Sequence, residues 1–235
     1  AFRRYATSAY GHNTILVDGK GQARDHRDPK NRIVSEPIDA HWISMDEYDY
    51  ACGTYNQGFG KVDDLVATQT RQILFLKPGI VLVADTLEPN DDASHTYQAR
   101  WNVNCTQLKE VVKDHPALVT TLEKKKNLVV VPLLTNGLEN RWVSQQVEPE
   151  VLGWYVIKDA GPYRPAATIC HTVNGKGIRR FLTMFVILEP GEESPIKSVK
   201  QLSDKSAEVA FADGRVMTVA MELDQLNYSI TEAAQ

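Results

Sequence analysis

The stretch Ile73–Ala84, ILFLKPGIVLVA, places two apolar runs on either side of a short turn. Lys77-Pro78-Gly79 supplies the turn, because proline and glycine favour the backbone angles that tight turns require. Each run is apolar at consecutive positions, which is typical of a strand that is covered on both faces. The stretch therefore predicts a tight hairpin in the middle of a β-sheet core.

Strand patterns continue on both sides of this hairpin. Tyr97–Val103 alternates apolar and polar residues, as a half-buried strand does. Leu128–Leu134 and Phe181–Leu188 are continuous apolar runs like those of the hairpin. Near the end of the chain, Asp213-Gly214 separates two further strand patterns and favours a hairpin with a type I′ turn.

Helical patterns are nearly absent, and only Gln107–His115 suggests a short turn of helix. The predicted fold class is therefore all-β: a large antiparallel two-layer β-sandwich, with a small C-terminal β-sheet subdomain as an option. The polar stretch Glu189–Pro195, rich in Pro and Gly, marks a boundary. It divides the main sandwich, residues 1–190, from terminal strands or a small β subdomain, residues 191–235.

Composition excludes several classes of partner. The 235 residues carry a formal net charge of −4, so there is no basic surplus to neutralise nucleic acid. Lys124–Lys126 is expected to be an exposed hairpin tip. No apolar run approaches the ~20 residues that span a bilayer, and no signal peptide is visible. Because the chain starts at Ala1 without an initiator Met, we expect a processed protein or an excised piece.

The three cysteines, Cys52, Cys105 and Cys170, are scattered and have no C-x-x-C spacing. A disulfide framework and a zinc ribbon are both disfavoured by this pattern. We expect the cysteines to be small buried hydrophobic residues.

The six histidines contain no H-x-H or H-E-x-x-H motif. His26 lies in a charged loop, where a solvated side chain is the default, and the default for His41, His115 and His171 is a structural role. His95 begins the alternating strand, and a functional role there stays open.

His12 stands out by its setting in "GHNTILVDGKGQ", residues 11–22. Asn13 and Thr14 can fix the local backbone or the second ring nitrogen, as is usual around a metal-bound imidazole. Spacing alone leaves both a metal ligand and an ordinary buried histidine open.

The segment "HNTILVDGKGQ" resembles the histidine-asparagine-threonine segment of heparinase II/III-like polysaccharide lyases, which include alginate and heparan lyases. Thr70–Val103 is similar to their next landmark: an arginine-led strand, a Pro-Gly turn, a Val/Asp strand and a histidine-led strand. The resemblance implies a C-terminal β-sandwich that packs against an N-terminal helical α/α toroid, with the active cleft between them.

The resemblance also implies chemistry. His12 corresponds to one ligand of the family's structural zinc, and the other two ligands and the catalytic residues would precede Ala1. The reaction implied is β-elimination on an acidic, uronic-acid-containing polysaccharide, in a periplasmic or secreted bacterial enzyme. The chain would not be active alone, and no catalytic residue is assigned within it.

Two alternatives compete with this interpretation. One is a non-catalytic β-sandwich that binds carbohydrate or a partner protein, which exposed aromatic side chains in a row on one sheet would favour. The other is a complete β-only enzyme with a site around His12, His95 and His171. An uncovered apolar face, where a helical domain would dock, would instead favour the lyase interpretation.

Overall fold

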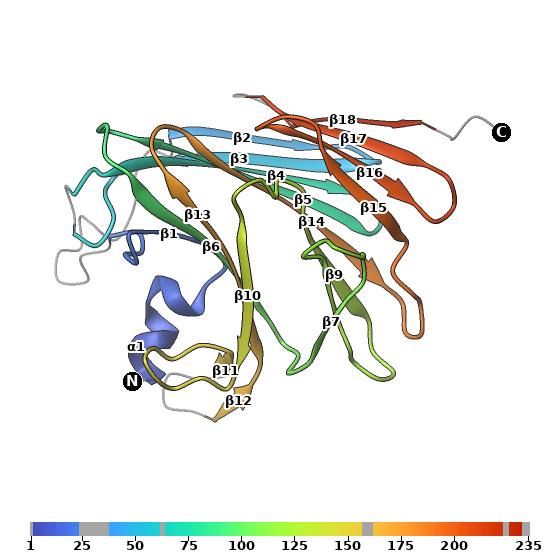
Figure 1. Ribbon diagram of the computed structural model, residues 1–235, viewed down its shortest axis with the longest axis horizontal. Helices are drawn as coiled ribbons and strands as arrows, with labels where there is room; N and C mark the ends of the chain where they lie inside the picture. The colour runs from blue at the N-terminus through green and yellow to red at the C-terminus, as the bar shows by residue number, and fades with distance from the viewer. Residues whose placement is uncertain (1, 24–37, 62–63, 157–161, 223–225, 232–235) are drawn as a thin grey trace.

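The computed structural model describes residues 2–23, 38–61, 64–156, 162–222 and 226–231. In these segments, helix is confined to α1 (Phe2–Thr7) and the 3-10 turn η1 (Ala9–Gly11), and the regular structure is otherwise β-strand (Figure 1). All strand pairs in the sheets are antiparallel. The prediction of an all-β antiparallel sandwich is confirmed.

The central sheet has eight strands in the order β2-β3-β4-β5-β14-β9-β8-β7. The predicted hairpin forms its middle: β4 and β5 pair through Leu76 and Ile80 on either side of the Pro-Gly turn. The bounds of the eight strands are β2 Ile38–Ser44, β3 Tyr48–Tyr55, β4 Ala67–Leu76, β5 Ile80–Pro89, β7 Leu108–Glu110, β8 Leu118–Thr120, β9 Asn127–Pro132 and β14 Arg179–Leu188.

A four-stranded sheet, which we call the covering sheet, packs on one face of the central sheet. Its order is β1-β6-β13-β10, with β1 Ile15–Val17, β6 His95–Val103, β13 Ala167–Gly175 and β10 Glu139–Ser144. Val83 and Phe181 of the central sheet share a buried cluster with Tyr97 and Ile169 of the covering sheet. β11 (Trp154–Val156) and β12 (Tyr163–Pro165) form a separate two-stranded ribbon.

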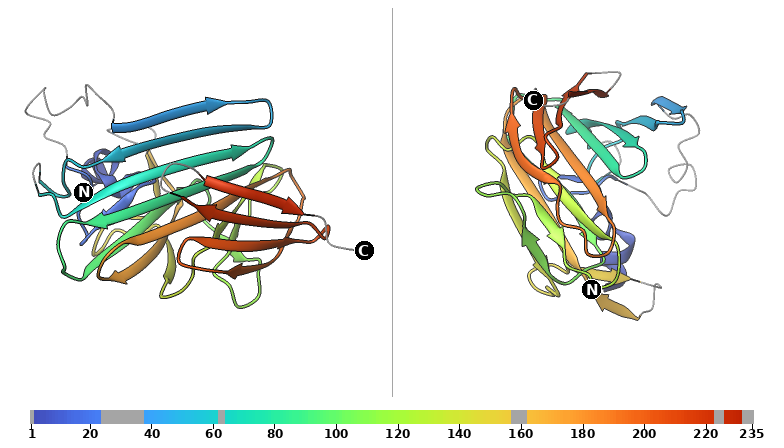
Figure 2. Two further views of the ribbon diagram at one scale, coloured as in Figure 1. Left: turned by 90° about the horizontal axis from the view of Figure 1, so that it is seen from above. Right: turned by 90° about the vertical axis from the view of Figure 1, so that its right-hand side faces the viewer.

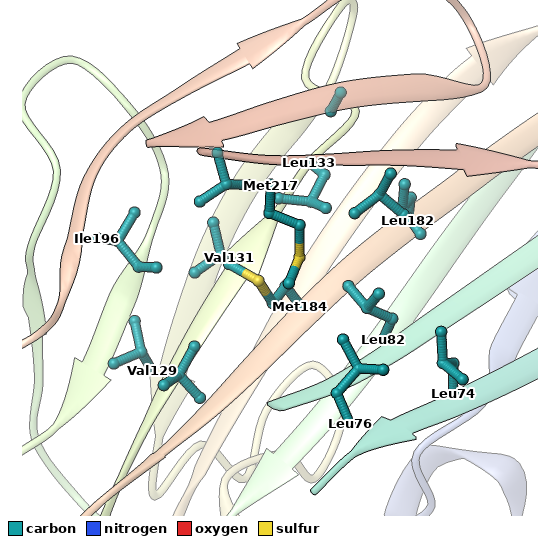
Figure 3. Close-up of a cluster of buried hydrophobic side chains, with 14 of the residues drawn as sticks. Leu74, Leu76, Leu82, Val129, Val131, Leu133, Leu182, Met184, Ile196 and Met217 are labelled. Carbon is teal, nitrogen blue, oxygen red and sulfur yellow. The ribbon is translucent and has the colours of Figure 1, made fainter. Parts of the chain in front are cut away.

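The opposite face of the central sheet is covered by the C-terminal sheet. This sheet comprises β15 (Ile196–Gln201), β16 (Ser206–Phe211), β17 (Val216–Met221) and β18 (Leu226–Thr231), and its strands lie over the central sheet rather than beside it (Figure 2). Met217 packs in one buried cluster with Leu82, Leu182 and Met184 of the central sheet (Figure 3). The C-terminal sheet therefore shares its apolar core with the central sheet. The domain boundary at residues 190 and 191 stays a prediction.

Alternation along single strands explains why the central sheet has two apolar faces. On β14, Phe181 points to the covering sheet, whereas Leu182 and Met184 point to the C-terminal sheet. Successive side chains of a strand point to opposite faces, so a continuous apolar run fits a strand buried on both sides. The consecutive apolar residues of the sequence are thus the signature of this middle layer.

Two Asp-Gly turns adopt different geometries. Asp18 and Gly19 both have positive φ, and Val17 and Lys20 exchange two backbone hydrogen bonds, as in a type I′ hairpin. At the second turn only Gly214 has positive φ, and its N–H donates to the Phe211 carbonyl. The predicted hairpin is present there, but its loop is one residue longer than a type I′ turn and ends in a glycine bulge.

Other local expectations have mixed outcomes. Lys124–Lys126 lies exposed between β8 and β9, as expected. The helical turn suggested for Gln107–His115 is wrong, because Leu108–Glu110 pairs with β8 as strand β7. The cysteines are free thiols: Cys105 and Cys170 are buried and Cys52 is half-buried. No helix in the described segments is long and apolar enough to cross a membrane.

Candidate functional site

The His12 ring has a defined orientation just before strand β1. Its Nδ1 lies 2.7 Å from the backbone carbonyl oxygen of Ser8, four residues earlier and just before η1. A carbonyl oxygen only accepts hydrogen bonds, so Nδ1 carries the hydrogen and Nε2 keeps its lone pair. The ring is exposed, and Nε2 bonds no residue in the described part of the chain. His12 is therefore oriented to offer Nε2 to a ligand.

Asn13 holds this segment against the covering sheet. Its side-chain Oδ1 accepts a hydrogen bond from the backbone N–H of Asn102 at 2.7 Å. Its backbone carbonyl accepts a second one from Nη1 of Arg71 at 2.6 Å. The carbonyl of Thr14 accepts from the N–H of Arg100 at 3.0 Å. The backbone next to His12 is thus fixed by strand β6 of one sheet and strand β4 of the other.

Arg71 is itself held by a buried carboxylate. Its Nε and Nη2 donate to Oδ1 and Oδ2 of Asp85 at 2.7 and 2.9 Å, a two-point pairing that fixes the guanidinium plane. Asp85 is fully buried and also accepts from Gln69 at 2.8 Å. Gln22 donates to Gln69 at 3.0 Å. The guanidinium also lies 5.4 Å from the centre of the Trp101 ring.

The register of the β4–β5 hairpin is the signal in the sequence that points to this pair. Leu76 pairs with Ile80 next to the turn, and counting outward places Arg71 opposite Asp85. The apolar residues of the hairpin predict its two strands, but they do not by themselves draw attention to the charged positions farther from the turn. Arg71 and Asp85 are therefore the elements of the site that sequence reasoning missed.

A pocket of about 380 Å³ opens beside this network. Its walls come from the segments on either side of β1 and from β2, β3 and β4, and they combine several polar side chains with a mainly apolar surface. The residues that line it are Thr14, Gln22, Ile38, Gly53, Thr54, Tyr55, Gln69 and Arg71. Gly53 has no neighbouring atom where a Cβ would stand, so the floor of the pocket is open at that point.

Next to this pocket, the end of the central sheet carries an uncovered apolar row. Trp42, Ala51 and Ile73 are register partners across β2, β3 and β4, so their side chains share one face. Trp42 is 71% exposed and Ile73 is 38% exposed. Only one aromatic side chain lies in this row, so the described strands show no row of exposed aromatic residues here.

His95 is bound between two carboxylates. Its Nδ1 lies 2.7 Å from Oδ2 of Asp18, and its Nε2 lies 2.9 Å from Oδ1 of Asp91. The hydrogen bonds to Asp18 and then to Asp91 raise the pKa of His95. Asp18 sits in the type I′ turn and also accepts from the N–H of Thr96. This arrangement ties the turn to the start of β6.

The remaining histidines do not join a common site. His171 is buried, both of its ring nitrogens lack a hydrogen-bond partner among the described residues, and burial lowers its pKa to about 4. The pKa of His115 is lowered, again mainly by burial. His41 is exposed on the edge strand β2, opposite Cys52. His26 lies outside the described residues.

The β-only enzyme interpretation fails on this geometry. His171 lies in the buried layer between sheets, His95 is occupied by two carboxylates, and His12 is exposed. Within the described segments, no three His, Cys, Asp or Glu side chains gather where they could hold a metal ion. His12 therefore joins no such cluster in the described segments, although its Ser8 hydrogen bond is of the kind that orients a ligating imidazole.

Comparison with solved structures shows the fold. The chain is similar to heparan sulfate lyase HepC from Pedobacter heparinus, with TM-score 0.58 and 12% identity over 95% of this chain and 30% of that one. It is also similar to the heparinase III-BT4657 gene product, with TM-score 0.61 and 10% identity over 94% and 30%. The chain thus spans less than a third of the length of either.

Sequence comparison shows the family. No curated protein sequence matches the chain. The sequence profile of the family described as "Heparinase II/III-like, C-terminal" matches residues 1–200. This match covers most of the 235 residues and includes the His12 segment, the Arg71–Asp85 hairpin and both sheets that meet there. The chain belongs to the heparinase II/III-like C-terminal family.

Proposed function

We propose that this chain is the C-terminal β-sandwich portion of a polysaccharide lyase that cleaves uronic-acid-containing glycans by β-elimination. In this proposal the catalytic helical toroid precedes the chain, and the protein acts in the periplasm or outside a bacterial cell. The observation that carries the proposal is the anchored His12 segment, in a chain that belongs to the heparinase II/III-like C-terminal family.

The reaction proposed needs no water. A base removes the proton from C5, the C4–O4 bond breaks, an acid protonates O4, and a double bond forms between C4 and C5. The C5 proton is weakly acidic, so the neighbouring carboxylate must be neutralised as negative charge develops. Tyrosine and histidine suit the two proton transfers. We place these groups in the preceding helical domain and assign no catalytic residue to this chain.

The uncovered end of the central sheet supports the two-domain arrangement. The apolar row Trp42, Ala51 and Ile73 lies next to the pocket at Arg71, on the same face of the sheet. An apolar surface of this kind fits a docked helical domain, and the polar side chains in the neighbouring pocket, among them Gln22 and Arg71, can bind the hydroxyl groups of a glycan. A row of exposed aromatic side chains would instead favour the alternative, a non-catalytic sandwich that binds carbohydrate.

The product identifies the reaction. A polypeptide extended upstream through the proposed helical domain should convert alginate or a glycosaminoglycan into oligosaccharides with an unsaturated uronate at the non-reducing end. Mass spectrometry distinguishes this product from a hydrolysis product, which is heavier by one water molecule. Hydrolysis products, or no cleavage of any acidic glycan, would overturn the proposal.

We further propose that His12 supplies Nε2 to a structural zinc ion whose other ligands precede the chain. When bound, zinc would supply a cross-link that stabilises the fold beside the cleft. Within this chain, the Ser8 carbonyl orients the ring, and Asn13 fixes the adjacent backbone.

Metal analysis tests the His12 assignment without an activity assay. In the extended polypeptide, His12→Ala should lower the zinc content per chain, because one of three ligands is lost. His41→Ala is the matched control, since His41 is also an exposed histidine. Unchanged zinc stoichiometry in His12→Ala would remove His12 from the ligand set.

A further inference from the structure

A second pocket lies at the end of strand β6. It has a volume of about 650 Å³ and is open to solvent. Its walls come from the end of β6, the β8–β9 hairpin, β12 and the end of β14. The residues that line it are Asn102, Val103, Asn104, Cys105, Thr106, Thr120, Leu122, Lys125, Lys126, Asn127, Leu128, Arg164, Pro165 and Ile187.

The charged side chains of this pocket are all cationic. Lys125, Lys126 and Arg164 line it, and no Asp or Glu does so among the described residues. Lys126 pairs with Glu189 at 2.5 Å, and both side chains are more than half exposed, so this ion pair is weak. Lys125 and Arg164 are exposed and form no ion pair in the described part of the chain. A locally cationic pocket therefore occurs in a chain whose net charge is −4.

Polar and apolar side chains line the pocket together with these cations. Asn104 and Thr106 present an amide and a hydroxyl group at the rim. Leu122, Leu128 and Ile187 add apolar surface, and Ile187 is 39% exposed. Amides and hydroxyls recognise sugar hydroxyl groups, apolar side chains contact the C–H faces of sugar rings, and cations pair with carboxylate or sulfate groups.

We propose that this pocket, which we call the lysine pocket, binds an acidic oligosaccharide through its carboxylate or sulfate groups. Single-stranded nucleic acid fits less well, because no aromatic side chain among the described residues lines the pocket for base stacking. The choice of a glycan as ligand rests on the proposed function. The cationic lining of the pocket is observed independently of it.

The lysine pocket adjoins the anchored His12 segment. Asn102 links the two: it lines the lysine pocket, and its backbone N–H donates to the Asn13 side chain. An oligosaccharide held there would lie at the end of β6, beside the residue that holds Asn13. The lysine pocket would thus hold part of a long acidic chain outside the catalytic centre.

Direct binding measurements on the 235-residue chain test this inference. The probes are oligosaccharides of alginate, which carry carboxylates, oligosaccharides of heparan sulfate, which carry carboxylates and sulfates, and uncharged dextran of similar length. Lys125→Ala/Arg164→Ala removes two cations from the pocket. Lys197→Ala/Lys200→Ala is the control, since it removes the same charge from two residues of β15 that do not line the pocket.

We expect at least one acidic oligosaccharide to bind and dextran not to bind. The pocket variant should weaken binding by about tenfold or more, because hydrogen bonds to charged groups are lost, while the control changes it by less than about twofold. Added salt should weaken binding by the wild-type chain. None of the four side chains is buried, so the variants should keep the wild-type urea midpoint.

Four results would overturn the inference: no binding of either acidic oligosaccharide, equal binding of dextran, equal losses in both variants, or tighter binding of a single-stranded oligonucleotide through the same side chains. The measurement needs no turnover, so it is separate from the test of the lyase proposal. If the extended polypeptide cleaves nothing while binding still depends on Lys125 and Arg164, only the lyase proposal fails.

Discussion

At the level of single residues, the site depends on groups that hold other groups in place. His12 offers Nε2 because the Ser8 carbonyl fixes Nδ1. Asn13 is held by Arg71, and Arg71 is held by Asp85. The histidine is the residue that the sequence draws attention to, but the buried Arg71–Asp85 pair determines where its backbone lies.

Asp85→Asn tests how much this pair contributes. The substitution keeps the size of the side chain but leaves the Arg71 guanidinium without its counter-ion in a largely buried position. We expect a loss of about 3 kcal/mol in the free energy of unfolding, measured in urea. Asp213→Asn, which breaks the exposed ion pair with Arg215, should cost much less, because solvent screens exposed charges. Equal losses would contradict the structural role assigned to Asp85.

His171 predicts a dependence of stability on pH. Its pKa falls from 6.5 to about 4 in the folded protein because burial disfavours the charged ring. Between these values the unfolded chain binds a proton that the folded chain does not, so stability falls as pH falls. The lowered pKa of the half-buried His115 acts in the same direction. The expected loss from His171 between about pH 7 and about pH 4 is up to about 3 kcal/mol.

Urea unfolding across this pH range measures the effect. His171→Phe fills the same buried site with a ring that does not titrate, so its free energy of unfolding should fall less steeply with acidification than that of the wild type. His41→Ala changes an exposed histidine and should keep the wild-type slope. If His171→Phe also keeps the wild-type slope, then the buried ring is not the source of the acid sensitivity.

At the level of strands and sheets, apolar patterning in the sequence predicts the strands well. The hairpin around Pro78 forms as expected because its two runs suit a strand buried on both sides. The pattern of Gln107–His115 suggests a helical turn, although Leu108–Glu110 joins the sheet edge. A strand of three residues has too little pattern to distinguish it from a helical turn, and its pairing with β8 decides the outcome.

Met217→Ala tests whether the C-terminal sheet is part of the same core. Met217 is fully buried against Leu182 and Met184 of the central sheet. Truncation should leave a cavity and lower the free energy of unfolding by about 2–5 kcal/mol in one cooperative transition. Met45→Ala removes the same atoms from a 51% exposed residue and should have little effect. A separate early transition for the C-terminal strands would show that this sheet folds independently.

At the level of the whole molecule, the central sheet is covered on both faces over most of its area, but one face of β2, β3 and β4 leaves the row Trp42, Ala51 and Ile73 uncovered. The sequence predicts an antiparallel sandwich because strand periodicity is a local signal. It does not predict that Asn13, Arg71 and Asn102 meet, since their contacts join two different sheets. Only the Arg71–Asp85 part of the site could be derived by counting register within one hairpin.

This arrangement is the structural basis for our proposal that a second domain completes the site. The described residues gather no metal cluster, and His12 presents its free nitrogen at the surface. The uncovered row at Trp42 and the pocket at Arg71 lie on one face, which is where we propose that a second domain docks.

Release of unsaturated uronate is the decisive test of the proposed two-domain lyase. Residues 1–235 alone and the polypeptide extended upstream through the proposed helical domain are incubated with the same alginate and glycosaminoglycan panel, and the new C4–C5 double bond is followed by its absorbance. We expect product from the extended polypeptide and none from residues 1–235 alone. Sustained release of unsaturated uronate by residues 1–235 alone would show that the catalytic groups lie within this chain, contrary to the proposal.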